Sequence, residues 1–201
     1  MPRTTSDTPP PPRIGDALAF AAEVHASDLR KGTTVPYLAH LLGVCALVLV
    51  DGGDEDEAIA ALLHDSIEDH ADVVTRELLE ARYGARVAQL VQDCTDTPAD
   101  YAGGKKPPWR QRKEAYITHV RETPPERLRV SVADKVDNLR AILANHRVLG
   151  AALWTRFNAG QADQQWYYSA LTEAYRAAGV RSVLLTEFER LVGELGELAE
   201  S

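Results

Sequence analysis

The chain has 201 residues, of which 45% are hydrophobic and 26% are charged, and this composition indicates one globular domain with a sizeable core. Its formal net charge of -8 argues against a general nucleic-acid binder, because such proteins are normally basic. No apolar run is long enough to cross a membrane. The two cysteines stand in apolar helical segments without a Cys-x-x-Cys motif, which argues against a disulfide framework and a thiolate zinc site.

Residues 1–13 contain four consecutive prolines and no apolar stretch, so they predict a disordered tail and not a secretory signal. We therefore expect a cytoplasmic protein whose single domain spans residues 14–201. Apolar residues at helical spacing predict helices over 14–27, 37–50, 55–67, 73–82, 85–94, 109–121, 125–145, 160–178 and 180–200. Glycine and proline mark the intervening loops, the longest of which covers 97–108.

Only residues 129–133 alternate in the manner of a strand, and apolar residues continue at helical spacing beyond them, so we expect a helix there as well. The predicted fold is therefore all-α, a single domain of roughly eight to ten helices. The last predicted helix carries an apolar stripe that could serve a homodimer. This stripe consists of Val183, Leu184, Phe188, Leu191, Val192 and Leu195.

The most informative motif is the pair His64-Asp65, which follows the apolar run 58–63 directly. On a continuous helix, residues four apart share a face, so we expect His64 beneath Glu68 and Asp65 beneath Asp69. Charge at the end of a core helix is costly unless something neutralises it, and a divalent cation would do so. Taken alone, the motif fits a solvated acidic helix turn equally well.

Two further residues, His40 and Asp134, also interrupt apolar helical segments. Together with His64 and Asp65 they form a set of two nitrogen and two oxygen donors, which suits Mn²⁺, Fe²⁺, Zn²⁺ or Ni²⁺. Four protein ligands leave positions open for water and substrate, and the absence of thiolates argues against a purely structural zinc. Each alone has a simpler explanation, for His40 a buried and satisfied imidazole, and for Asp134 an ion pair with Lys135 or Arg140.

Five ordered blocks, spanning about residues 16 to 176, resemble the HD superfamily of metal-dependent phosphohydrolases. Within it, they resemble the small stand-alone RelA/SpoT-type alarmone hydrolases, such as the metazoan SpoT homologues. The blocks are His25-xxxx-Arg30-Lys31-Gly32, Pro36-Tyr37-Leu38-Ala39-His40, Ala61-Leu62-Leu63-His64-Asp65-Ser66-Ile67-Glu68-Asp69, Tyr83-Gly84 and Val132-Ala133-Asp134-Lys135-Val136-Asp137-Asn138-Leu139-Arg140.

This resemblance implies a helical fold, usually with Mn²⁺, that hydrolyses guanosine 3′,5′-bis(diphosphate) or its pentaphosphate (ppGpp or pppGpp) to GDP or GTP and pyrophosphate. It also implies a role for each candidate residue. The metal ligands would be His40, His64, Asp65 and Asp134. The attacking water would be oriented or deprotonated by Glu68 and Asp69. The nucleotide would be contacted by Arg30, Lys31 and Asn138.

The segment 105–113 holds five basic residues and a tryptophan, a local positive excess in an acidic chain. We hypothesise that it lies over the site, with Lys105 and Arg112 meeting the outer phosphates of a nucleotide. The competing interpretation is a solvated loop. Either way, the expected partner is a small nucleotide, with no nucleic acid and no membrane involved.

Leu41 follows His40 where the resembled family usually has proline, which changes a helix start and not the ligand. Two further positions depart from the family pattern. His70 stands where a threonine is usual, and it could either reach the site or point to solvent. Ala141 stands where many members carry threonine or aspartate, so a polar group near the nucleotide is missing. Another substrate therefore stays open, namely the 2′-phosphate of NADPH or a nucleoside monophosphate. A non-catalytic module that senses a nucleotide is the third hypothesis, against which the intact ligand set argues.

Overall fold

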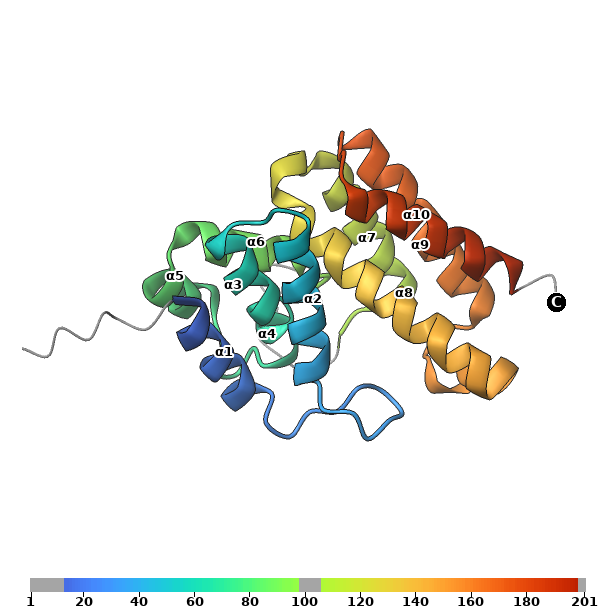
Figure 1. Cartoon of the computed structure of the whole chain (residues 1–201), viewed down its shortest axis with the longest axis horizontal. Helices are drawn as coiled ribbons and strands as arrows, with labels where there is room; N and C mark the ends of the chain where they lie inside the picture. Colours follow the sequence, from blue (N-terminus) through green and yellow to red (C-terminus); the bar gives the residue numbers. More distant parts are fainter. Residues whose placement is uncertain (1–12, 98–105, 199–201) are drawn as a thin grey trace, which may run out of the picture.

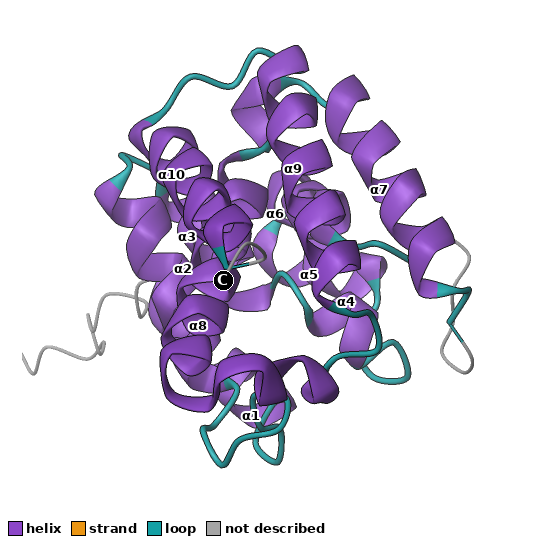
Figure 2. Ribbon diagram, turned by 90° about the vertical axis from the view of Figure 1, so that its right-hand side faces the viewer, coloured by secondary structure: helices purple, strands orange, loops and turns teal. Residues whose placement is uncertain are grey.

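The structure is a computed structural model that describes residues 13–97 and 106–198. Over these ranges it contains ten α-helices and two 3-10 helices, and the only β pairing is an isolated bridge between Leu29 and Pro36 (Figures 1 and 2). The all-α prediction is therefore confirmed. The helices are α1 (Arg13–Val24), α2 (Leu38–Val50), α3 (Glu55–Leu63), α4 (Ser66–Asp69), α5 (Arg76–Tyr83), α6 (Ala85–Cys94), α7 (Trp109–Glu122), η1 (Pro125–Arg127), α8 (Arg129–Leu149), η2 (Gly150–Arg156), α9 (Gln161–Ala177) and α10 (Val183–Glu197).

Local side-chain chemistry sets several helix ends. Asp54 accepts the Glu57 backbone N–H while the Glu57 carboxylate accepts the Asp54 N–H, a capping box that starts α3. The hydroxyls of Thr75 and Ser182 accept the backbone N–H groups of Leu78 and Leu185 and so cap α5 and α10. Gly84 separates α5 from α6 with a φ of 97°, a conformation that side-chain-bearing residues rarely adopt. The predicted break at this glycine is confirmed.

Helix α3 is the centre of the fold, because its residues from Glu57 to Leu63 are buried on every side. It packs against α1, α2, α6 and α8, and the long helix α8 in turn packs against α2 and α10 (Figure 1). A helix that is apolar all round fits only in such a position. The carboxyl end of α3 therefore opens where α2 and α8 pass it, inside the domain.

The predicted continuous helix over 55–67 is wrong in one respect: it is interrupted at His64 and Asp65, which form a turn between α3 and α4. The Ser66 hydroxyl donates to the Leu63 carbonyl at 2.6 Å, a local bond that competes with the helical ladder. The ladder resumes with the Asp69 N–H, which donates to the Asp65 carbonyl at 2.9 Å. The two stacked columns expected on one helix face are therefore replaced by a turn.

The apolar stripe of α10 is used inside the chain. Leu184, Phe188, Leu191 and Leu195 are buried, and α10 packs against α8 and α9. Of the predicted stripe, Val183 is 81% exposed. A homodimer stays a prediction, now without this stripe as its interface.

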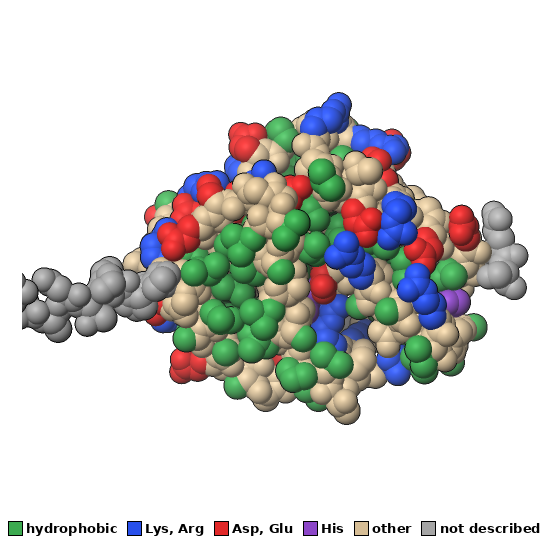
Figure 3. Space-filling view, viewed as in Figure 1, with side chains coloured by type: hydrophobic (Ala, Val, Ile, Leu, Met, Phe, Trp, Pro, Cys, Tyr) green, Lys and Arg blue, Asp and Glu red, His purple; other side chains and the backbone are tan. Residues whose placement is uncertain are grey.

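The visible face of the molecule divides into two regions. Apolar side chains gather over α1 to α3, where Leu42 and Leu49 of α2 are exposed, and charged side chains gather over α8 and α10 (Figure 3). Among the charged groups, Arg140 of α8 pairs with Glu187 of α10 at 3.0 Å. Such exposed pairs contribute little stability each, so the apolar packing beneath them holds the two helices together.

Several composition-based expectations have clear outcomes. Cys45 and Cys94 are free and buried, as expected of small apolar side chains. Among the described helices, none combines the length and apolar character that a membrane crossing requires. The predicted proline-rich tail over 1–13 lies outside the described residues except for Arg13, where α1 already begins, so the tail and the domain boundary stay predictions.

Candidate metal centre and adjoining cavities

Three separate parts of the chain bring the four predicted ligands to one point. His40 lies on α2, His64 and Asp65 form the turn after α3, and Asp134 lies on α8. Asp134 Oδ1 is 3.3 Å from His40 Nε2 and 3.6 Å from His64 Nε2. Asp65 Oδ2 is 2.9 Å from His64 Nε2 and 3.7 Å from His40 Nε2. His40, His64 and Asp65 thus have ligand atoms within 4.8 Å of one another, and Asp134 lies beside both imidazoles.

The two imidazoles present their free nitrogens to this point. His40 Nδ1 donates to Asp137 Oδ2 at 2.6 Å, and His64 Nδ1 donates to the Ala61 carbonyl at 2.8 Å. In both rings Nε2 is buried and makes no hydrogen bond with the described residues, although carboxylate oxygens are close. An imidazole fixed through Nδ1 with its Nε2 lone pair directed inward is the usual state of a metal-binding histidine. The donor set therefore fits a divalent transition metal.

The electrostatics of the centre lead to the same conclusion. Against the effect of burial, the carboxylates of Asp134 and Asp137 raise the pKa of His40 to about 9. Burial also opposes charge on His64, yet Asp65 raises its pKa well above the usual range. Despite burial, Lys135 and the imidazoles hold the pKa of Asp134 far below normal. The carboxylates thus attract positive charge strongly, and a bound ion would replace the protons that supply it.

Three neighbouring side chains hold the ligand carboxylates in place. The Tyr37 hydroxyl donates to Asp65, the Lys135 ammonium donates to Asp134 Oδ2, and the Asn138 amide donates to Asp134 Oδ1. The sequence reasoning did not identify Tyr37 or Asp137 as part of the centre. Asp137 could have been found, because it lies three residues after Asp134 and so shares its helix face.

The acidic pair Glu68 and Asp69 lies on α4, one turn beyond the ligand Asp65. Lys106 Nζ donates to Glu68 Oε1 at 2.8 Å and to Asp69 Oδ1 at 3.3 Å. Burial and the charge of Asp96 raise the pKa of Glu68, and burial and the charge of Asp65 raise the pKa of Asp69. These carboxylates therefore bind protons more readily than ordinary surface acids do.

In the basic segment 105–113, the residue that binds the acidic pair is neither of the two that the sequence analysis singled out. Lys105 lies outside the described residues, whereas its neighbour Lys106 binds the acidic pair. Arg112 is paired with Asp96, and its Nη1 is 3.8 Å from Glu68 Oε1. The interpretation as a purely solvated loop is therefore wrong for Lys106 and Arg112, and phosphate contact by Lys105 and Arg112 stays a prediction.

The predicted nucleotide contacts share a cavity of about 230 Å³ beside the centre. Arg30 Nη1 donates to Asn138 Oδ1 at 3.0 Å, and Lys31 Nζ donates to Asn158 Oδ1 at 3.2 Å. The cavity adjoins the ligands because Asn138 also binds Asp134. The lining residues are Arg30, Lys31, Thr33, Tyr37, Asn138, Ala141, Ile142, Asn145, Leu153, Arg156, Phe157 and Tyr168. Ala141, one of the departures from the family pattern, therefore faces this cavity.

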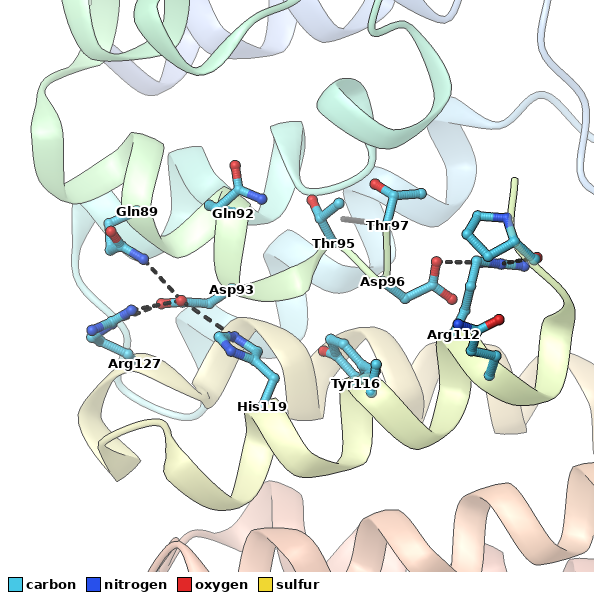
Figure 4. A pocket seen from close by; sticks show the side chains of 13 residues that line it. Gln89, Gln92, Asp93, Thr95, Asp96, Thr97, Arg112, Tyr116, His119 and Arg127 are labelled. Carbon is cyan, nitrogen blue, oxygen red and sulfur yellow. Dashed lines mark hydrogen bonds and ion pairs between the residues drawn. The ribbon is translucent and has the colours of Figure 1, made fainter. Parts of the chain in front are cut away.

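A second cavity of about 460 Å³ lies between α6 and α7 and contains none of the predicted ligands. The Asp93 carboxylate makes most of the polar contacts in this cavity (Figure 4). It accepts two hydrogen bonds from Arg127, at 2.6 and 2.7 Å, and one from Gln89 at 2.9 Å. His119 Nε2 lies 3.4 Å from the same carboxylate. Asp96 and Arg112 form its other ion pair (Figure 4). The charged side chains of this cavity are thus paired with one another.

Comparison with known proteins identifies relatives of the whole arrangement. The HD domain family matches residues 17–155. The guanosine-3′,5′-bis(diphosphate) 3′-pyrophosphohydrolase MESH1 of Xenopus tropicalis is 36% identical over 130 residues, covering 63% of this chain and 68% of that protein. Human MESH1 is 34% identical over 128 residues, covering 62% and 66%. The matched regions thus span about two thirds of each relative.

A solved structure shares the fold over nearly the full length. It is that of a metazoan ortholog of SpoT described as hydrolysing ppGpp, with a TM-score of 0.73 over 98% of this chain and 99% of that chain. The sequence identity of that pair is 24%, so this match shows the fold alone. The helices that carry the four predicted ligands thus belong to an architecture that is already known.

Proposed function

Because this chain belongs to the HD-domain family, we propose that it hydrolyses ppGpp or pppGpp, releasing pyrophosphate and GDP or GTP. The observation that carries the proposal is the convergence of two buried imidazole Nε2 atoms and two carboxylates beside a cavity lined by Arg30 and Lys31. The activity named for the MESH1 relatives supports the choice of substrate.

We assign the metal to His40, His64, Asp65 and Asp134, with Mn²⁺ as the resident ion. A divalent ion there supplies Lewis-acid polarisation of a phosphoryl oxygen and lowers the pKa of water in the site. Two imidazoles and two carboxylates suit Mn²⁺ as well as its neighbours in the transition series. Asp137 and Ala61 orient the two imidazoles, so the chain itself fixes the direction from which the ion is bound.

Glu68 and Asp69 act as the general base in this proposal. Water attacks the inner phosphorus of the 3′-diphosphate, the bond from phosphorus to the 3′ oxygen breaks, and that oxygen receives a proton. The raised pKa values of Glu68 and Asp69 suit a group that must take a proton near neutral pH. Lys106 keeps the two carboxylates together, and Lys105 and Arg112 are the proposed contacts of the outer phosphates.

The nucleoside side of the substrate is assigned to the cavity of Arg30, Lys31 and Asn138. The planar guanidinium of Arg30 lies 6.0 Å from the Tyr37 ring centroid, in a position to stack on a purine while facing phosphate. Lys31 adds a point charge, and the Asn138 amide links the ribose to the ligand Asp134. A cytoplasmic location belongs to this proposal, because a highly charged nucleotide does not cross membranes unaided.

A second candidate is favoured by one specific observation: Ala141 lines the cavity and offers no polar group. The 2′-phosphate of NADPH or a nucleoside monophosphate would then be the substrate, with the same metal chemistry. The third hypothesis, a non-catalytic nucleotide sensor, is disfavoured by the four ligands and the acidic pair, since buried charges are costly to keep without a use.

One experiment distinguishes the three functional hypotheses. The protein is stripped of metal, reloaded with Mn²⁺ and assayed for product release from ppGpp, NADPH and guanosine monophosphate. We expect pyrophosphate from ppGpp, with turnover abolished by Asp65→Ala. Preferred release of phosphate from NADPH or the monophosphate would favour the second candidate. Tight ppGpp binding without turnover of any substrate would favour the sensor.

A further inference from the structure

A second group of imidazole and carboxylate side chains lies outside the centre described above. It consists of His25, which follows α1, Asp28 in the next loop, and His70, which follows α4. Their ligand atoms all lie within 4.8 Å of one another. Asp28 Oδ2 is the common point, 2.8 Å from His25 Nδ1 and 2.7 Å from His70 Nε2. His70, which departs from the family pattern, thus pairs with Asp28 and is not one of the four predicted ligands.

Packing fixes the geometry of this group. His25 is only 3% exposed, its ring stacks on Tyr37 with centroids 5.2 Å apart, and the edge of His70 meets it at 4.7 Å. His25 Nε2 is buried and has no hydrogen-bond partner among the described residues, so the polar contact of this ring is made through Nδ1. Two nitrogens and one carboxylate oxygen therefore lie together in the folded chain.

One side of the group is open. A hollow of about 510 Å³ lies beside it, lined by Ser27, Asp28, Leu29, Tyr37, Asp69 and His70. This opening leaves room for water to complete a coordination shell. Asp69 adds negative charge on the same hollow, which favours a cation there.

We propose that His25, Asp28 and His70 form a second, three-ligand site for a divalent transition metal, for which Zn²⁺ is the best match. Two imidazoles, one carboxylate and an open position are the ligand set of many zinc sites. Zn²⁺ also binds nitrogen donors more strongly than Mn²⁺ does. With one ligand fewer than the first site, the second fills at higher metal concentration. Nothing in this proposal depends on the proposed hydrolase activity.

The two sites are linked through one side chain. The Tyr37 ring stacks on His25, while its hydroxyl donates to the ligand Asp65 of the first site. Asp69, one of the two proposed general bases, borders the hollow of the second site. An ion at the second site thus places a double positive charge beside the acidic pair.

The experiment counts bound metal. Protein stripped with a chelator is titrated with Zn²⁺, dialysed, and analysed for ions per chain by atomic emission. The wild type should retain two ions at saturation and His70→Thr one. The matched control is His146→Thr, which removes a histidine that contacts Trp154 elsewhere in the fold and should retain two. A single ion on the wild type, or two on His70→Thr, would overturn the proposal.

The second site is then isolated by removing the first with His64→Ala. Zn²⁺ should still raise the Tm of His64→Ala, and this rise should vanish in the double variants that add His70→Thr or Asp28→Asn. Circular dichroism confirms that each variant is folded, and Asp28→Asn, which keeps side-chain size, serves if His70→Thr is unfolded. Absence of a Zn²⁺-dependent rise in His64→Ala overturns the second site. Failure of the ppGpp assay with the rise intact overturns only the proposed function.

Discussion

His40 and Asp137 form the hydrogen bond that orients the first proposed metal ligand: the ring Nδ1 lies 2.6 Å from the carboxylate Oδ2, which leaves Nε2 directed at His64 and Asp134. His40 is on α2 and Asp137 on α8, so this bond also ties together the two helices that flank the centre. The side chain that sets the direction of the ligand is thus not itself a ligand.

Replacing Asp137 by Asn should weaken Mn²⁺ binding. Asn keeps an acceptor for the imidazole N–H but loses the negative charge that makes the ring a stronger donor, and such outer partners typically contribute about 10- to 100-fold in metal affinity. Calorimetric titration of metal-free protein with Mn²⁺ gives the measurement. Asp163→Asn, which changes a half-exposed aspartate on α9, is the control and should bind Mn²⁺ as the wild type does. Equal affinity of Asp137→Asn and this control would contradict the role.

The same bond can be disturbed from the backbone side. A Cβ at Gly43 of α2 would lie 2.5 Å from Asp137 Oδ1, so Gly43→Ala must push that carboxylate away from His40. We expect weaker Mn²⁺ binding and lower turnover. Gly15→Ala is matched to it, since a Cβ at Gly15 of α1 meets nothing within 4 Å, and it should leave metal binding unchanged while stabilising the helix by up to about 1 kcal/mol. Mn²⁺ titrations and thermal melts of both variants provide the measurement. Identical Mn²⁺ affinity in the two variants would show that a Cβ at Gly43 does not displace the Asp137 carboxylate from His40.

Lys106→Met should shift the pH dependence of turnover. Burial and neighbouring carboxylates raise the pKa of Glu68 and Asp69, and the Lys106 ammonium offsets part of that rise. A general base works only when ionised, so removing this cation should raise its pKa and move the acid limb of kcat/KM to higher pH, by about 1 unit or more. Activity is then lost at low pH and kept at high pH. Arg121→Met, which removes an exposed cation from the last turn of α7, should leave the limb in place. If the acid limb of Lys106→Met does not move, this lysine does not influence the pKa of the general base.

Ala141→Thr should tighten substrate binding. The residue lines the cavity assigned to the nucleoside, and a hydroxyl there can form one hydrogen bond worth about 1 kcal/mol, or roughly five-fold in KM. Steady-state kinetics with ppGpp and NADPH would show which substrate gains. If KM for both substrates is unchanged, position 141 does not face the bound nucleotide.

The sequence was most informative where charge interrupts apolar helices. His40, His64 and Asp134 stood out because a buried ionisable group must be compensated, and the structure brings these residues to one point. The turn at His64 was not predictable from propensity. Its backbone stays near helical values, with φ -60° and ψ -29°, and only the tertiary setting and the Ser66 hydroxyl separate α3 from α4.

Other residues of the centre could not be predicted from the sequence, for a different reason. Asp137 and Lys106 carry charges that, in sequence, look like those of any solvated helix or loop. Their roles depend on which distant side chain they meet, His40 on α2 for Asp137 and Glu68 on α4 for Lys106. Asp28 and His70 are likewise separated by 42 positions, so their hydrogen bond appears only in the folded chain. Pairings of this kind follow from the packing of the helices and not from local pattern.

The central claim is that His40, His64, Asp65 and Asp134 bind a single divalent ion. An anomalous difference map from crystals grown with Mn²⁺, recorded at the manganese absorption edge, tests it most directly. The account predicts a peak about 2.2 Å from both imidazole Nε2 atoms and from an oxygen of each carboxylate. No peak among these four side chains, or a peak that contacts only one of them, would contradict it.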